Sequence, residues 1–130
     1  MHFSVDPHSH VPPSQQLVAG VLDAIARGDL SVGDRLPPVR ALATQVLVNP
    51  NTVSKAWRDL ERMGVTAGRN GSGVFVTADG PRIARDLRLA ATLVELRAAV
   101  RTALGAGHDA DALRALIATE LERERVGGGT

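Results

Sequence analysis

Apolar side chains recur at helical spacing in two segments near the start of the chain, residues 14–27 and residues 39–46. Their apolar positions are Leu17, Val21, Leu22 and Ile25 in the first, and Val39, Leu42, Ala43 and Val46 in the second. Spacings of three and four residues place such side chains on one face of an α-helix. The pattern predicts two amphipathic helices, with Gly28 as the stop of the first and a turn over residues 33–38 between them.

A third helical segment, residues 49–63, has a sharply defined start. Asn49 can accept a hydrogen bond from a backbone N–H of the first turn, and Pro50 suits the first helical position because it has no N–H to leave unpaired. The apolar positions are Val53, Ala56, Trp57 and Leu60, whereas Asn51, Lys55, Arg58 and Arg62 fall on a different stripe. This pattern predicts a helix that packs on one face and is polar to basic on the other.

The front of this third helix suits DNA recognition. Asparagine can bond bidentately to adenine, threonine can bond bases or touch a thymine methyl, and a helix N-terminus followed by a cation suits phosphate. Taken alone, the segment would favour an ordinary amphipathic surface helix, because most such helices bind nothing. Only Leu47 and Val48 separate it from the preceding helix, however, and this is the short connection that a helix-turn-helix needs.

Two β-prone runs follow, residues 64–67 and residues 74–77, joined by a glycine-rich stretch. They predict a β-hairpin, or wing. Arg69, Asn70 and Ser72 near its tip could reach a phosphate or the minor groove, and Gly71 would allow close backbone approach. The alternative is a plain surface turn.

The remainder of the chain predicts two further helices. Residues 82–104 carry two apolar stripes, Gly105 and Gly107 interrupt the helix, and a second helix begins at Asp109 or Asp111. The apolar positions expected at an interface are Ile83, Leu87, Leu89, Leu93, Leu96, Val100, Leu113 and Ile117. Large exposed apolar patches are rare on monomers, so we expect these helices to form a dimerisation hairpin. Alternatively, both helices fold back on their own chain.

The order of the segments resembles a known family. GDRLPPVRALA, VNPNTVSKAWRDLERMGV and then RNGSGVFV are similar to the winged-helix domain of GntR-type bacterial transcription regulators. Residues 5–9 and 12–17 resemble the lead-in strand and first helix of the short YtrA-like branch of that family. The resemblance covers roughly the first 77 residues, which is enough for one small domain.

The resemblance implies roles for residues at matching positions. Arg35 and Arg40 match arginines that contact DNA, the residues at the front of the third helix match the contacting positions of the recognition helix, and Asn70 and Gly71 match the wing tip. The expected DNA-binding residues, with two cations added from the helical pattern, are Arg35, Arg40, Asn49, Pro50, Asn51, Thr52, Ser54, Lys55, Arg58, Asn70 and Gly71. The alternatives are a solvated helix arginine for Arg40 and, for Ser54, a hydroxyl bonded to its own helix backbone. The short branch also carries a two-helix tail used for dimer contacts.

Three positions depart from the family pattern. Leu47 stands where the family commonly has glycine, which predicts a helix-to-helix turn with a different backbone or greater length. Pro38 replaces a common serine and so removes a capping hydroxyl, and Ser14 replaces a tyrosine of the branch.

Composition and charge agree with this interpretation. The chain has 44% hydrophobic content, no cysteine and a net charge of +1. With 130 residues we expect one compact domain with a small appendage and no separate large effector domain. Between residues 27 and 69, seven basic residues stand against four acidic ones, a basic patch suited to phosphates. No signal peptide is visible and no apolar stretch approaches about 18 residues, so we expect a cytoplasmic protein with no membrane partner.

Motifs for catalysis and metal binding are not apparent. The histidines are His2, His8, His10 and His108. Asp6, His8 and His10 make only a weak candidate metal cluster near the N-terminus, and no HExxH spacing, nucleophile–base pattern, P-loop or dinucleotide fingerprint occurs. We therefore expect no enzyme, no catalytic residue, no cofactor and no metal site.

The predicted fold class is mainly α with a small β-hairpin (α+β). It comprises a winged helix-turn-helix domain over residues 1–78, a helical dimerisation tail over residues 79–126 and a flexible C-terminus over residues 127–130. The predicted function is a homodimeric, sequence-specific DNA-binding transcription regulator, more specifically a repressor, on a two-fold symmetric operator of double-stranded DNA. The alternative is a winged-helix adaptor that binds an acidic protein. An unidentified small-molecule effector would sit between the winged helix and the tail, near residues 89–100.

Overall fold

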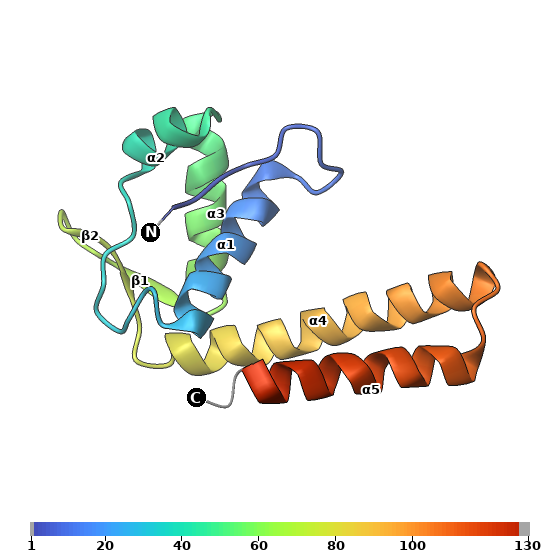
Figure 1. Ribbon diagram of the computed structural model, residues 1–130. Helices are drawn as coiled ribbons and strands as arrows, with labels where there is room; N and C mark the ends of the chain where they lie inside the picture. Colours follow the sequence, from blue (N-terminus) through green and yellow to red (C-terminus); the bar gives the residue numbers. More distant parts are fainter. Residues whose placement is uncertain (1, 128–130) are drawn as a thin grey trace. The chain divides into compact units, whose positions relative to one another are not determined.

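The computed structural model describes residues 2–127 (Figure 1). Along the chain it contains α1 (Pro13–Arg27), α2 (Val39–Val46), α3 (Pro50–Arg62), β1 (Thr66–Arg69), β2 (Gly73–Val76), α4 (Gly80–Gly105) and α5 (Ala110–Gly127). β1 and β2 form an antiparallel hairpin. The predicted fold class, mainly helical with one small β-hairpin, is confirmed.

The chain divides into two compact units, Met1–Ala90 and Ala91–Thr130. The division falls inside α4, later than the boundary expected after residue 78, because the start of α4 packs on the winged helix. Ala84 is fully buried there, and Arg88 forms an ion pair with Asp23 of α1. The first unit therefore includes the beginning of α4, and the assignment of separate roles to the two parts stays a prediction.

Three helices enclose the core of the first unit. α1 and α3 lie side by side, and α2 packs against α3 (Figure 1). The predicted apolar face of α3 is buried: Val53, Ala56 and Leu60 are inaccessible, and Trp57 is 4% exposed. The Trp57 indole Nε1–H donates to the Pro37 carbonyl at 3.2 Å, which satisfies its polar atom and attaches α3 to the link before α2.

The predicted helix boundaries hold at both capped ends. α1 ends where Gly28 adopts a left-handed conformation (φ 86°), so that the Asp29 N–H reaches the Ala24 carbonyl at 2.8 Å. At the start of α3, the Asn49 side chain accepts a hydrogen bond from the Asn51 N–H at 2.8 Å. Pro38 precedes α2 without any side-chain cap, as its missing hydroxyl predicts.

The N-terminal segment differs from the lead-in strand that the resemblance implies. Residues 2–12 form no strand, and the segment is held instead by side chains of α1. The Gln16 amide donates to the Asp6 and Val11 carbonyls, at 3.0 and 2.8 Å, and accepts from the Asp6 N–H. Phe3 is buried over Gly20, where a Cβ would lie 3.4 Å from its ring, so this mid-helix glycine makes room for the aromatic side chain.

The wing begins two residues later than predicted. Gly64 (φ 82°) and Val65 close the C-terminal end of α3 rather than opening a strand, because their N–H groups bond carbonyls of its last turns. β1 and β2 then pair with Thr66 opposite Val76 and Arg69 opposite Gly73. The link before α2 runs along the other edge of β2, where the Leu36 N–H donates to the Val74 carbonyl at 2.8 Å.

The second unit consists of the C-terminal part of α4 and α5, which run antiparallel (Figure 1). Gly107 (φ 103°) turns the chain, and the Asp109 carboxylate accepts from the Ala112 N–H, which confirms Asp109 as the start signal. α5 has no buried residue. Gly127 ends α5 and is therefore helical rather than part of a frayed tail, and the rest of the expected flexible C-terminus, residues 128–130, lies outside the described residues. None of the helices formed by residues 2–127 is long and apolar enough to cross a membrane.

Candidate nucleic-acid interface

The turn between α2 and α3 places leucine where the backbone favours glycine. Leu47 has φ 61° and ψ 49°, and among residues 2–127 it is the only non-glycine residue with a positive φ. The expectation of an altered or longer turn is therefore wrong, because leucine adopts the left-handed conformation itself. Its side chain is 89% exposed, so packing does not compensate for the strained backbone.

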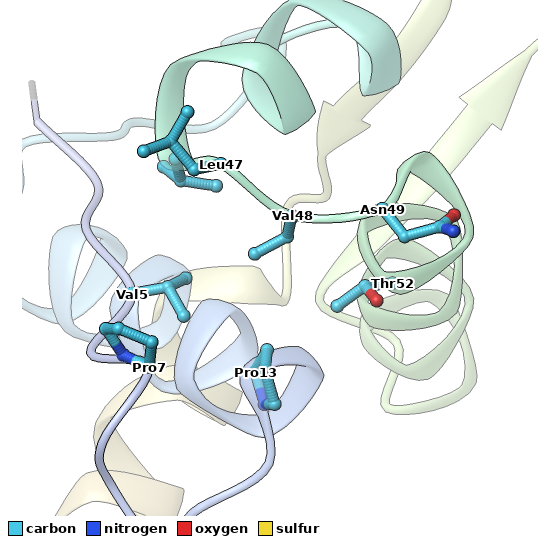
Figure 2. Close-up of a pocket in the computed structure, with 8 residues that line it drawn as sticks. Val5, Pro7, Pro13, Leu47, Val48, Asn49 and Thr52 are labelled. Carbon is cyan, nitrogen blue, oxygen red and sulfur yellow. The ribbon is translucent and has the colours of Figure 1, made fainter.

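A shallow hollow of about 460 Å³ lies beside this turn (Figure 2). Val5, Pro7 and Pro13 line one side, and residues 46–49 and Thr52 line the other. Figure 2 shows the Thr52 side chain extending toward the hollow, while the Asn49 amide points away from it. The start of α3 is thus open to solvent on two sides.

The predicted contact residues at the front of α3 lie on its accessible face. Asn51, Lys55 and Arg58 are exposed, whereas Thr52 and Ser54 are half-buried. The side-chain oxygen of Asn49, Oδ1, caps the helix. The side-chain NH₂ group of Asn49 therefore remains as a donor for an outside ligand. In the described part of the chain the Ser54 hydroxyl bonds no backbone carbonyl, unlike the Thr44 hydroxyl, which donates to the Arg40 carbonyl at 3.1 Å. The self-bonded alternative for Ser54 is therefore not observed.

The basic residues around α3 differ in their partners. The Lys55 ammonium and the Arg62 guanidinium both bind the Asp59 carboxylate, at 3.1 and 2.8 Å. Such exposed pairs contribute at most about 1 kcal/mol, so a phosphate can compete for them. Arg35, Arg40, Arg58 and Arg69 are exposed and pair with no carboxylate within residues 2–127. These four arginines carry the unneutralised positive charge of the interface.

The wing brings two residues that the sequence did not single out, Gly73 and Phe75, together with the predicted candidates Arg35 and Arg69. Asn70 and Gly71 lie at the exposed tip as predicted, with Gly71 at φ 70°. The Arg69 guanidinium stacks over the Phe75 ring, 4.5 Å from its centroid. A Cβ at Gly73 would lie 2.5 Å from the Arg35 Nε, so the Arg35 side chain would have to move for any other residue. The φ of 119° also favours glycine at this position. Alternate residues of a strand lie on the same face of the hairpin, and this pattern could have pointed to Phe75 and Gly73. Pairing them with Arg69 also requires the register of the two strands, which the sequence does not give.

The residues predicted for a dimer interface fall into two groups. Ile83 is half-buried and packs against the core of its own winged helix, near Gly64, so it offers less surface to a partner than the other predicted residues. Leu87 and Leu89 lie nearby in the first unit, 39% and 66% exposed. The residues in the second unit remain accessible to differing degrees: Leu93, Leu96, Val100, Leu113 and Ile117.

Four of these residues meet in one groove of the second unit. Leu96 and Val100 of α4 face Leu113 and Ile117 of α5 around an apolar hollow of about 210 Å³. Leu96 is 50% exposed and Ile117 is 40% exposed, so this groove leaves considerable apolar surface in contact with water.

The weak candidate metal cluster does not assemble. Over residues 2–127 no group of three or more histidine, aspartate or glutamate side chains is placed to hold a metal ion. The Asp6 carboxylate instead accepts from the His8 backbone N–H at 2.9 Å, which orders the turn before α1.

The helix-turn-helix and its wing coincide with a known domain. Residues 13–76 match the family described as bacterial regulatory proteins, gntR family. These residues form a GntR-family domain. The HTH-type transcriptional repressor YtrA of Bacillus subtilis (strain 168) is 39% identical over 75 residues, which are 58% of this chain and 58% of that protein. The chain thus spans little more than half the length of this curated relative.

Solved structures of GntR-family and other regulators share the fold. A transcriptional regulator from Oenococcus oeni superposes with a TM-score of 0.73 at 27% identity, covering 90% of this chain and 97% of that chain. The AraR DNA-binding domain in complex with operator ORX1 superposes with a TM-score of 0.53 at 25% identity, covering 59% of this chain and 100% of that chain. The second of these domains is bound to operator DNA.

Proposed function

We propose that this protein is a transcription regulator, acting as a repressor, that binds a specific operator in double-stranded DNA as a homodimer. The observation that carries the proposal is the accessible front of α3, where a capped, core-anchored helix in a GntR-family domain presents Asn51 and Thr52. Rigid placement matters because base recognition depends on hydrogen-bond geometry.

The proposed mode of binding places the N-terminal end of α3 in the major groove. Asn51 and Thr52 would contact base edges, while the Asn49 amide and the first-turn backbone lie near a phosphate. Arg40 at the start of α2 and Arg58 on α3 would bind backbone phosphates because both guanidinium groups are exposed and lack a carboxylate partner within the described chain. Lys55 would exchange Asp59 for phosphate.

The proposed dimer forms through the second unit. The pairing of α4 with α5 leaves no residue of α5 buried, so these two helices cannot form a stable core alone. A second copy of the chain would cover the groove between Leu96 and Ile117. A two-fold dimer would also present two α3 helices to half-sites about one turn of DNA apart. Because the proposed ligand is chromosomal DNA, we place the protein in the cytoplasm. We also propose that it is not an enzyme.

The test is binding of the purified protein to a fluorescent duplex from upstream of its own gene, beside a scrambled duplex of equal length. Titrations at several salt concentrations should show tighter binding to the upstream duplex and an affinity that falls steeply with salt. Equal, weak binding to both duplexes would contradict an operator-binding role and would favour the adaptor alternative.

A small-molecule effector stays a prediction. Ligand binding to the folded state raises its stability, so a thermal-shift screen against metabolite pools would detect one. A screen in which no compound shifts the melting temperature would argue against effector control.

A further inference from the structure

One face of the wing carries two arginines. Arg69 pairs with Gly73, Arg35 forms an isolated bridge with Phe75, and Gly73 and Phe75 are two residues apart on β2. Cross-strand partners share a face of a sheet, and alternate residues of a strand share a face. Arg35, Arg69, Gly73 and Phe75 therefore form one surface, called here the arginine face.

The two guanidinium groups of the arginine face lie against the wing in different ways. Arg69 leans diagonally across the hairpin onto the Phe75 ring at 4.5 Å. From the other edge of β2, Arg35 crosses Gly73, where any side chain would collide with its Nε. The stacking of Arg69 on Phe75 restricts its rotamers in the free protein, so less conformational entropy is lost when Arg69 binds a ligand. Arg69 is thus ordered before any ligand arrives, and Arg35 lies beside it on the same face.

The arginine face is also free of neutralising carboxylates. Neither Arg35 nor Arg69 forms an ion pair among the residues that the structure describes. Glu61 approaches the wing at Gly68, but Gly68 pairs with Val74 and therefore belongs to the opposite face. Positive charge is concentrated on one side of the hairpin.

The shape of the wing favours the minor groove of DNA as the surface that it contacts. Its tip, residues 70–73, has no bulky side chain, so the backbone can approach a groove about 6 Å wide. Arginine is more weakly hydrated than lysine and is favoured in narrow A·T-rich minor grooves, where the negative potential is enhanced. Both cations of the arginine face, Arg69 of the wing and Arg35 of the link before α2, are arginines.

We propose that the arginine face reads minor-groove shape, so that the operator requires narrow A·T-rich base pairs flanking each half-site that α3 contacts. This inference rests on the proposed function and adds Arg69, with Phe75 as its positioning residue, to the residues that set specificity. Bases in the flanks would be selected by groove width and potential, without hydrogen bonds to their major-groove edges.

Base analogues in the flanks test the proposal directly. In the preferred upstream duplex, the A·T pairs beside the half-sites are replaced by G·C or by inosine·C, which presents a G·C-like major groove but lacks the minor-groove amino group. We expect G·C flanks to weaken binding roughly tenfold and inosine·C flanks to restore most of the loss. Inosine·C flanks that bind as weakly as G·C, or flanks without effect, would overturn the proposal.

Protein variants assign the effect to the arginine face. Arg69→Lys keeps the charge but loses the planar group, and Phe75→Leu removes the stacking platform. Both should reduce the flank preference, which is the ratio of the affinities for A·T and G·C flanks, at least about threefold. Arg27→Lys, the same exchange at the end of α1, is the matched control. If Phe75→Leu melts early, Arg69→Lys decides alone, and an unchanged flank preference in that variant overturns the proposal.

The failure of this inference is distinguishable from failure of the proposed function. A wild-type protein with no preference for the upstream duplex over the scrambled one would remove the operator-binding role itself. A retained half-site preference with no response to flank analogues or to Arg69→Lys would remove only the reading of minor-groove shape.

Discussion

The winged helix and the helical tail use apolar residues in opposite ways. In the winged helix, side chains such as Val53 and Leu60 are fully buried, and the Trp57 indole has a hydrogen-bond partner. In the tail, α5 buries nothing, and Leu116 and Leu121 are 57% and 67% exposed. Similar helical periodicity therefore produces a self-sufficient core in one region and, in our proposal, an intermolecular surface in the other.

The difference is also visible in how each region begins and ends. In the winged helix, specific contacts fix the ends of the helices: the Asn49 cap at the start of α3, the Gly28 stop at the end of α1, and the close contact of Gly80 with the Val65 carbonyl at the start of α4. The tail has side-chain interactions mainly within single helices, such as the pair of Arg114 and Asp111 at 2.7 Å. Exposed pairs of this type add little stability, so the tail depends on what covers it.

The largest expected contrast is between core leucines and tail leucines. Leu60→Ala should lower the free energy of unfolding by about 2–5 kcal/mol because it leaves a cavity beside α3. Leu116→Ala, measured where the protein is monomeric, should cost under about 1 kcal/mol because the side chain is more than half exposed. Urea titration measures both, followed by the fluorescence of Trp57 for the winged helix and by far-UV circular dichroism for the tail, which has no tryptophan. Equal losses would contradict the contrast.

The next effect concerns self-association. Ile117→Glu places a charge in the groove of the second unit, and a dimer would contain two copies of it. We expect the dimer dissociation constant to rise by about 100-fold or more, or roughly 3 kcal/mol. Sedimentation velocity over a concentration series measures the change. Thr119→Glu, two residues along α5 and outside the groove, is the control, and an unchanged dimer in Ile117→Glu would exclude the groove as the interface.

Two glycines of α4 should respond to alanine with opposite signs. A Cβ at Gly80 would lie 2.8 Å from the Val65 carbonyl oxygen, so Gly80→Ala should destabilise the winged helix by about 1–3 kcal/mol. Nothing lies within 4 Å of a Cβ at Gly105, and Gly105→Ala should be neutral or stabilise α4 by up to about 1 kcal/mol. Thermal unfolding by circular dichroism compares them. A neutral Gly80→Ala would mean that α4 does not dock as described.

The smallest expected effect lies in the turn before α3. Leu47→Gly should stabilise the winged helix by about 0.5–1 kcal/mol, because relief of the left-handed strain exceeds the added chain entropy of glycine. Leu47→Ala keeps a Cβ at the same φ and should give no such gain. Chemical denaturation separates the two variants, and a destabilised Leu47→Gly would indicate that the exposed leucine makes a contribution that strain does not outweigh.

Much of the fold was predictable because its signals are local. Helical periodicity, the Asn49–Pro50 start, the Gly28 stop and the glycine-rich wing each act over a few residues, and the observed α1, α2 and α3 agree with them. The accessible face of α3 followed from the same periodicity. Leu47 shows the limit of this approach, since a preference for glycine does not determine how the backbone accommodates leucine.

The features that escaped prediction depend on long-range packing. The pairing of Arg69 with Phe75 requires the register of the wing, and the position of Arg35 requires the link before α2 to lie beside β2. The partial burial of Ile83 follows from the docking of α4 on the winged helix, which its own periodicity does not specify. The position of Phe3 likewise depends on a long-range contact, because its ring packs over Gly20 of α1.

The most direct test of operator reading by α3 is the ratio of dissociation constants for the scrambled and upstream duplexes, measured at fixed salt for the wild type, Thr52→Ala and Arg40→Ala. Loss of a base contact should lower the ratio by about 5- to 150-fold in Thr52→Ala, whereas loss of a phosphate contact in Arg40→Ala should weaken both complexes and leave the ratio nearly unchanged. A wild-type ratio near one, or a ratio that Thr52→Ala leaves intact while Arg40→Ala lowers it, would contradict the account.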